Sequence, residues 1–206
     1  MKKLNLLLTF VILLGLSQFG IAQIAGSGHD FSSAGWNASG EICIVCHTPH
    51  NADLTVAGAP LWNHSVSQVP SYILYSSVTM DAVVGQPDGS SKLCLSCHDG
   101  TVALENFGGV NTGTQLMTGN ALVGTDLSND HPVSFLYDDI LAGSDLGLFD
   151  PTNTQSGLGG TITETMLQGG KVQCASCHDV HNSANLPNLL LKSNAASALC
   201  LTCHDK

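Results

Sequence analysis

The chain has 206 residues, with 16 acidic residues, six lysines and no arginine, and its formal net charge is −10. Such a chain lacks the basic surface that nucleic acids require, which excludes that class of partner. Charged residues make up only 11% of the chain, well below the roughly 25% of ordinary soluble domains. The surface therefore depends on Ser, Thr, Asn and Gly, and a weakly charged surface favours self-association.

Residues 1–22 have the features of a secretory signal peptide. Lys2 and Lys3 precede a mostly apolar segment, and Gly20-Ile21-Ala22 supplies the small residues of a cleavage site. The alternative is a membrane anchor, but polar residues interrupt the apolar segment, which is also short for a bilayer span. We therefore predict a secreted protein, extracellular or at the cell surface, with the periplasm as the alternative location.

Residues 23–206 are predicted to form a single domain without a membrane span. Removal of residues 1–22 takes away two lysines and no acidic residue, which leaves four basic and 16 acidic residues in the remaining chain. This acidic surface is suited to attract a basic partner or divalent cations at low salt.

The sequence Cys-x-x-Cys-His occurs four times and uses all eight cysteines. This spacing is typical of c-type haem attachment, in which two thiols add to the porphyrin vinyl groups and the histidine binds the iron. We therefore expect four covalently bound haem c groups. The predicted thioether cysteines are Cys43, Cys46, Cys94, Cys97, Cys174, Cys177, Cys200 and Cys203. The predicted proximal iron ligands are His47, His98, His178 and His204.

Two other uses of paired cysteines fit the sequence less well. Eight cysteines in a secreted chain are also consistent with four disulfides, and Cys-x-x-Cys pairs occur in zinc sites. Neither alternative gives a reason for the histidine that follows every second cysteine. Haem attachment accounts for both features.

The four motifs alternate between two types, in the order A-B-A-B. An A motif has a second histidine three residues after the first, followed by Asn: His50-Asn51 in the first copy and His181-Asn182 in the third. A B motif is followed by aspartate, Asp99 in the second copy and Asp205 in the fourth. This pattern indicates an internal duplication whose halves differ in length.

Five histidines outside the motifs are candidates for the second axial position of the irons. His29 and His131 precede the two A motifs, and His50 and His181 are the twin histidines within them. These four predict bis-histidine ligation of all four irons. His64 has no counterpart in the second half, so it is either a spare, structural histidine or a fifth ligand if subunits share ligands.

The twin histidines of the A motifs imply close haem packing. A histidine three residues after the proximal ligand cannot reach the far face of its own haem, so it should bind the iron of a neighbouring haem. Methionine is the alternative axial ligand and would raise the potential. Because histidine is in surplus, we expect Met80, Met117 and Met166 to serve in apolar packing instead.

The fold class predicted is a multihaem c-type cytochrome that is mostly coil, with short helices, few short strands and the haems as its core. Residues 106–170, between the two halves, are rich in Gly, Thr, Asn and Ser, which predicts a linker or loop with short strands. Apolar runs at 121–123 and 132–137 are the candidate strands. Short helical turns are expected around the haem motifs and at 194–203, where alanines favour helix.

Six segments together resemble the doubled-CXXCH extracellular cytochromes. They resemble most closely the outer-surface tetrahaem cytochromes of metal-respiring bacteria, which polymerise into conductive filaments. The segments that carry the resemblance are Gly28–Ser32, Ile42–His50, Ala59–His64, Leu93–Ala103, Asn129–Pro132 and Cys174–Asn182. The likeness extends over nearly all of residues 23–206.

This resemblance implies a coil-rich protomer with closely stacked haems, assembled into a filament. In such filaments one haem takes an axial histidine from the adjacent subunit, which would correspond to His50 here, with His29 as the other candidate. The implied partners are further copies of the chain, upstream outer-membrane or periplasmic cytochromes, and an extracellular electron acceptor.

Three functions remain possible from the sequence. The first is an extracellular electron conduit that polymerises, and the second is a monomeric periplasmic or extracellular electron shuttle. The third is a multihaem reductase of a small oxyanion, which requires an iron with an open coordination position. Because five histidines are available as second ligands, we expect that the chain is not an enzyme.

Overall fold

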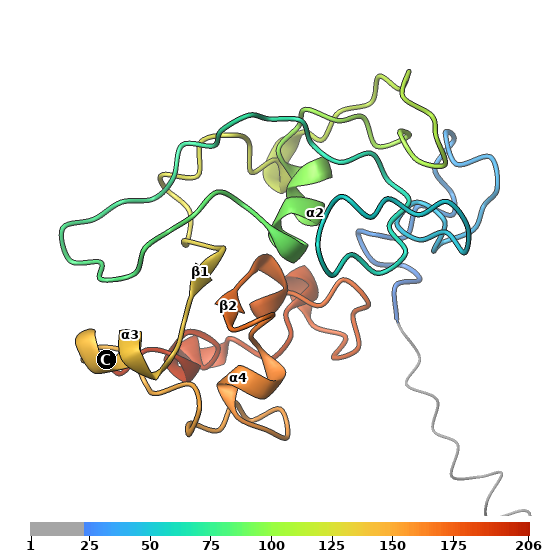
Figure 1. Cartoon of the computed structure of the whole chain (residues 1–206). Coiled ribbons are helices and arrows are strands. Elements are labelled where there is room, and N and C mark those ends of the chain that lie inside the picture. Colours follow the sequence, from blue (N-terminus) through green and yellow to red (C-terminus); the bar gives the residue numbers. More distant parts are fainter. Residues whose placement is uncertain (1–22) are drawn as a thin grey trace, which may run out of the picture.

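The computed structural model describes residues 23–206, which are mostly coil with short helices and one small sheet (Figure 1). The predicted signal peptide, residues 1–22, lies outside the described residues. The helices are α2 (Gly89–His98), α3 (Asp139–Ser144) and α4 (Ile162–Thr165). The 3-10 helices are η1 (Gly119–Ala121), η2 (Cys174–Ser176), η3 (Pro187–Leu189), η4 (Ala195–Ser197) and η5 (Cys200–Thr202). Within residues 23–206 no helix combines the length and apolar character needed to cross a bilayer.

Among residues 23–206 the longest helix is α2, which carries the second haem motif and lies at the centre of the part described. In Figure 1 the N-terminal coil lies on one side of it and the C-terminal elements on the other. Leu93 and Leu95 are buried on it, in two separate apolar clusters. The expected helical turns are present in short form at the third and fourth motifs, where η2 and η5 begin at Cys174 and Cys200, whereas the first motif has a turn and no helix.

A two-stranded antiparallel sheet joins β1 (Phe135–Leu136) to β2 (Lys171–Val172), with Phe135 opposite Val172. The candidate strand at 132–137 is therefore confirmed over two residues. The candidate strand at 121–123 is wrong, because η1 ends there and the following backbone binds the second haem motif instead. The amide groups of Val123 and Gly124 both donate to the carbonyl oxygen of His98, at 2.8 and 3.1 Å.

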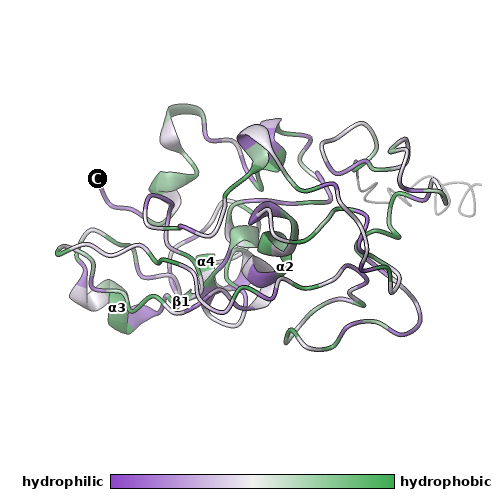
Figure 2. Ribbon diagram, turned by 90° about the horizontal axis from the view of Figure 1, so that it is seen from above, coloured by the Kyte–Doolittle hydropathy of each residue, from purple (hydrophilic) through white to green (hydrophobic). Residues whose placement is uncertain are grey.

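The largest apolar cluster lies in the second half of the chain and draws on the segment between the halves. Its buried members are Phe135, Tyr137, Ala142, Ile162, Met166, Val172 and Leu199. Cys177 and Cys203 pack against it, so this cluster supports the third and fourth haem motifs. Polar and apolar segments alternate closely along the coil in Figure 2, and accordingly the remaining apolar core is divided into two clusters of three buried residues each.

Of the three methionines expected in apolar packing, Met166 is in the core, whereas Met80 and Met117 are half-buried and belong to none of the apolar clusters described. Met166 is 4% exposed and lies inside the largest apolar cluster. Residues 106–170 are thus not a linker throughout, because their second half supplies much of the core beneath the last two motifs. α4 within this segment begins with a capping box between Thr161 and Glu164, which satisfies two amide groups at its start.

We predict that replacing Ile162 with Ala destabilises the protein by about 2–5 kcal/mol, because the side chain is fully buried and its loss leaves a cavity. Ile140→Ala is the matched control, since Ile140 is 74% exposed and should change the stability by less than about 0.5 kcal/mol. Guanidinium unfolding followed by circular dichroism measures both. Equal effects of the two substitutions would contradict the placement of this core.

Candidate functional site

The cysteines and histidine of each motif are placed by one tight backbone turn. The amide of the motif histidine donates to the carbonyl oxygen of the first cysteine at 2.8 Å in the first motif and at 3.0 Å in the third and fourth. The second motif has the same arrangement as part of α2. Residues three and four apart on such a turn lie on one face. The two thiols and the imidazole therefore project toward the same side, as a haem requires.

The two A motifs have the same backbone geometry, although different loops complete them. The residue after the motif histidine donates its amide to a leucine carbonyl, Leu61 in the first half and Leu189 in the second, at 2.9 and 2.7 Å. Both leucines have a left-handed backbone, with φ of 52° and 54°. Left-handed backbone is unfavourable for leucine. Its occurrence at both positions indicates a functional constraint on these loops.

This constraint places a backbone carbonyl against the ring of the motif histidine. The Nδ1 atom of His47 lies 2.6 Å from the carbonyl oxygen of Pro60, and that of His178 lies 2.9 Å from that of Asn188. In the second motif, His98 Nδ1 lies 2.7 Å from the Ala121 oxygen. A carbonyl only accepts, so Nδ1 must carry the proton and Nε2 is left as the metal-binding nitrogen.

Three motif histidines face a second imidazole at the separation that a shared metal requires. An imidazole nitrogen binds a metal at about 2 Å, so two rings on opposite sides of one metal have centres about 6 Å apart. The centre-to-centre distances are 6.3 Å for His47 and His181, 5.9 Å for His29 and His98, and 6.3 Å for His131 and His204. The residues present thus fit bis-histidine haem iron in three places.

Burial supports metal binding at two of these pairs. It is the main cause that lowers the pKa of His29 to about 4, and the nearby rings of His98 and His178 lower this pKa further. Burial and the neighbouring His131 likewise lower the pKa of His204. A ligating imidazole must be neutral, so these environments keep both rings ready to bind a metal. In addition, His29 Nδ1 is buried without a hydrogen-bond partner among the described residues.

The remaining motif histidine, His178 of the third motif, is not paired in this way. Within residues 23–206, no imidazole faces His178 at a comparable distance, and the same holds for His50. His50 is exposed and lies in a surface groove that Trp62 and His64 also line. The chain therefore contains one motif histidine and one candidate second ligand that it does not bring together.

His64 has a different environment from every other histidine described. It is 1% exposed, with Nδ1 2.9 Å from the Ser65 carbonyl oxygen and Nε2 3.0 Å from that of Ala103. Burial lowers its pKa, while the bonds to backbone carbonyls act in the opposite direction. Both nitrogens lie against backbone carbonyl oxygens, and they also lie 3.8 and 3.6 Å from the Cys97 sulfur, so His64 packs against the second motif without another imidazole opposite it.

The eight cysteines form no disulfide. Cysteines of successive motifs lie near one another, the first motif beside the second, the second beside the third and the third beside the fourth. Burial is the larger cause that raises the pKa of Cys97, in the second motif, to about 12. The nearby Cys46 of the first motif raises this pKa as well. Cys94 lies beside Cys174, and this neighbour together with burial raises the pKa of the Cys94 thiol. Cys177 in turn contributes to the raised pKa of Cys203.

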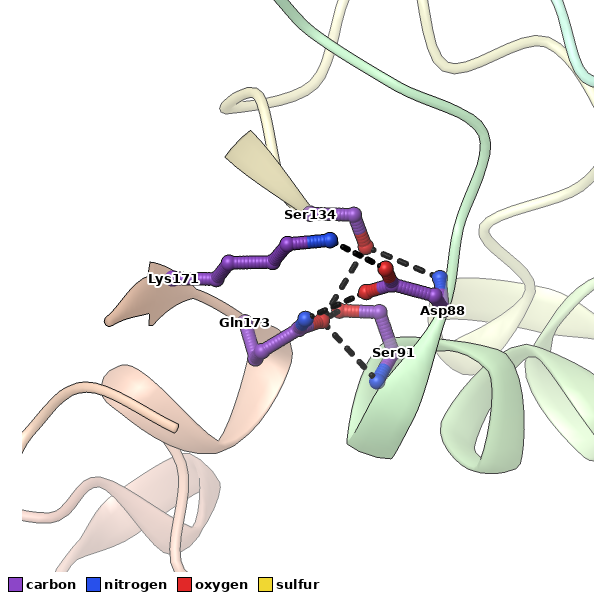
Figure 3. Close-up of polar contacts among 5 residues, drawn as sticks. All are labelled: Asp88, Ser91, Ser134, Lys171 and Gln173. Carbon is purple, nitrogen blue, oxygen red and sulfur yellow. Dashed lines mark hydrogen bonds and ion pairs between the residues drawn. The ribbon is translucent and has the colours of Figure 1, made fainter. Parts of the chain in front are cut away.

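A polar cluster fixes the second motif against the third (Figure 3). Asp88, before α2, forms an ion pair with Lys171 and accepts a hydrogen bond from the Gln173 side chain at 2.7 Å. The Gln173 side-chain oxygen accepts from both Ser91 and Ser134, and the Ser91 hydroxyl accepts from the Cys174 amide. The cluster thus connects the starts of α2 and η2, on which Cys94 and Cys174 lie.

Sequence reasoning missed this cluster and a second one around Asp99. No local pattern indicates the first, because its side-chain hydrogen bonds join segments 39 or more positions apart and its residues are common polar types. For the second, the aspartate after the B-motif histidine was visible, but its burial was not. The zinc alternative has no support in the described residues, among which no group of three or more His, Cys, Asp or Glu could hold a metal ion.

Residues 166–206, which contain the third and fourth motifs, match a family model described as the doubled CXXCH motif. No curated protein matches the chain. The doubled motif indicates a multihaem c-type cytochrome, in which haem c is bound covalently and transfers electrons.

Proposed function

We propose that the chain carries four c-type haems as an extracellular electron conduit and that it polymerises into a filament. The observation that carries this proposal is the set of three imidazole pairs at 5.9 to 6.3 Å, together with one motif histidine that has no such partner. When bound, haem c supplies a one-electron Fe(III)/Fe(II) couple, and the protein holds and spaces the irons.

These pairs support an assignment of ligands for three irons. In this proposal His47 and His181 would hold the haem of the first motif, His98 and His29 that of the second, and His204 and His131 that of the fourth. Because His181 belongs to the third motif, its bond to the first haem would bring the first and third haems together. The twin histidine of an A motif then acts on a neighbouring haem, as expected from its position.

Close spacing of the attachment sites supports electron transfer along the chain of haems. Cys94 and Cys174 come from different halves of the duplication and are in contact, so the second and third haems would adjoin at their vinyl edges. The polar cluster around Gln173 lies at this junction and resists changes in the spacing. Proximity of Cys46 to Cys97 and of Cys177 to Cys203 supports the same order at the other two junctions.

The iron of the third motif takes its second ligand, in this proposal, from His50 of another copy of the chain. His29 was the other candidate for this role, but its position opposite His98 gives it a partner within the chain. His50 is exposed, and the nearby Leu54 and Leu61 are 79% and 55% exposed, so its surroundings offer apolar area to a partner. Each copy donates one histidine and accepts one, which produces a filament rather than a closed dimer when the rotation does not close.

The low content of charged residues supports assembly, and the predicted signal peptide supports export. Electrons would enter the filament from outer-membrane or periplasmic cytochromes and leave to an extracellular acceptor. The second candidate, a monomeric shuttle, requires His50 to reach the His178 iron within one chain. A reductase requires an open iron in the working protein, and in the assembled form proposed here every iron has two histidines.

Carbon monoxide binding to the reduced protein tests the ligand assignment. We expect four haems per chain by mass spectrometry and no carbon monoxide binding in assembled protein, because every iron is six-coordinate. His131→Ala should open one iron and add one carbon monoxide per chain. His64→Ala is the control, and it should add none, because both nitrogens of His64 face carbonyl oxygens. Carbon monoxide binding by the assembled wild type would overturn the proposal in favour of an open, reactive iron.

The trans ligand is tested by His50→Ala. We expect this substitution to abolish filaments in electron microscopy and to yield monomers that bind one carbon monoxide at the haem of His178. His181→Ala, the same position of the other A motif, is the matched control: it should open an iron within the chain and leave assembly intact. If His50→Ala assembles as the wild type does, the trans ligation is wrong.

A further inference from the structure

Asp99, the residue after the second motif histidine, is a buried carboxylate that accepts four hydrogen bonds. Its side chain is 4% exposed. The Ser67 and Tyr72 hydroxyls donate to Oδ2 at 2.5 and 2.6 Å, and the Thr101 amide and hydroxyl both donate to Oδ1 at 2.8 Å. All four groups point donors at it, so each carboxylate oxygen accepts two hydrogen bonds.

No cation neutralises this charge among residues 23–206. The ion pairs formed there are Lys171 with Asp88 and His181 with Asp179. Lys92, on α2, lies over the ring of Tyr72 at 5.6 Å from its centre and makes no ion pair with Asp99. The charge of Asp99 is therefore held by hydrogen bonds alone, in a region from which water is largely excluded.

The charge acts on the haem-binding groups of α2. Asp99 follows His98 directly, and its amide donates to the Leu95 carbonyl as α2 ends. Its negative charge contributes to the raised pKa of the Cys97 thiol, after burial and Cys46. The field of the carboxylate thus reaches the attachment site of the second haem.

The equivalent positions of the other motifs lack this environment. Asp205, after the fourth motif histidine, is exposed, and Asp179, after the third, is half-buried beside His181. The first motif has Thr48 at this position. A buried aspartate with four donors therefore distinguishes the second motif from its three relatives within the same chain.

We propose that Asp99 is a fixed negative charge that lowers the reduction potential of the haem attached at Cys94 and Cys97. Ferric haem carries one more positive charge than ferrous haem, so a nearby carboxylate stabilises the ferric form, and more strongly where water is excluded. The inference rests on the proposed function, because it requires a haem at the second motif. Asp99 acts through the field and not as an iron ligand, and Ser67, Tyr72 and Thr101 hold it in place.

This charge would make the four haems unequal along the conduit. The carboxylate would make the second haem harder to reduce than the same haem without a nearby charge. The attachment site of this haem lies between those of the first and third motifs. An electron passing along the chain would then cross a step in energy at this position. The duplication gives both B motifs an aspartate after the histidine. The two differ in burial, because Asp99 is buried and Asp205 is exposed.

The test compares Asp99→Asn with Asp205→Asn in the haem-loaded protein. Asparagine keeps the shape and removes the charge, and the Ser67 and Tyr72 hydroxyls can rotate to accept from its amide. Redox titration followed by NMR of the haem methyl groups resolves the four haems. We expect Asp99→Asn to raise the midpoint potential of the second haem by about 59 mV or more. For one electron this is a tenfold change in the equilibrium constant of reduction. Asp205→Asn should shift the midpoint potential of the haem at the fourth motif by less.

The direction of the shift in midpoint potential distinguishes the loss of a charge from a loosening of the structure. A substitution that only loosens the site would admit water, which stabilises ferric haem and lowers the potential. A fall, or a shift no larger than that of Asp205→Asn, would overturn the inference. If Asp99→Asn fails to fold, Asp99→Gln and Asp99→Glu, equal in length, make the same comparison, and the Gln variant must have the higher potential. Absence of haem at Cys94 and Cys97 in the wild type would overturn the proposed function as well.

Discussion

The structure depends on the placement of one imidazole opposite another at about 6 Å. Three such pairs occur, and each joins segments far apart in the sequence: His29 to His98, His47 to His181, and His131 to His204. In the proposed haem-loaded protein, with iron between the rings, each pair would become a cross-link of the chain. A chain that is mostly coil, with small apolar clusters and a two-stranded sheet, needs such cross-links to fold into one body.

The rest of the protein serves to hold these rings in position. Loops of unequal length bring the carbonyl oxygens of Pro60 and Asn188 to the same nitrogen of the two A-motif histidines. Each of these loops contains a leucine with a left-handed backbone, which is unfavourable for that residue. The hydrogen bond decides which ring nitrogen is free, and so which one faces a metal. The cluster of Asp88, Ser91 and Gln173 joins the two halves, and in the proposed haem-loaded protein it would set the spacing between the second and third haems.

Much of this arrangement was visible in the sequence, because thioether attachment demands a fixed local spacing. The motifs, their turns and the coil-rich fold follow from residues that are neighbours in the chain. The partner of each motif histidine does not, since it depends on how loops of different length fold back. The strand expected at 121–123 failed for the same reason: the backbone there binds His98. The burial of Asp99 and the Gln173 cluster likewise depend on contacts between distant segments.

The most direct test of this account is a cryo-electron microscopy map of the secreted, haem-loaded protein, in which each iron and its two ligands are visible. The account predicts irons between His29 and His98, between His47 and His181, and between His131 and His204 of one chain. It predicts that the iron of His178 is completed by His50 of a neighbouring copy. A different partner in any of the three intramolecular pairs, or an iron with one histidine only, would contradict it.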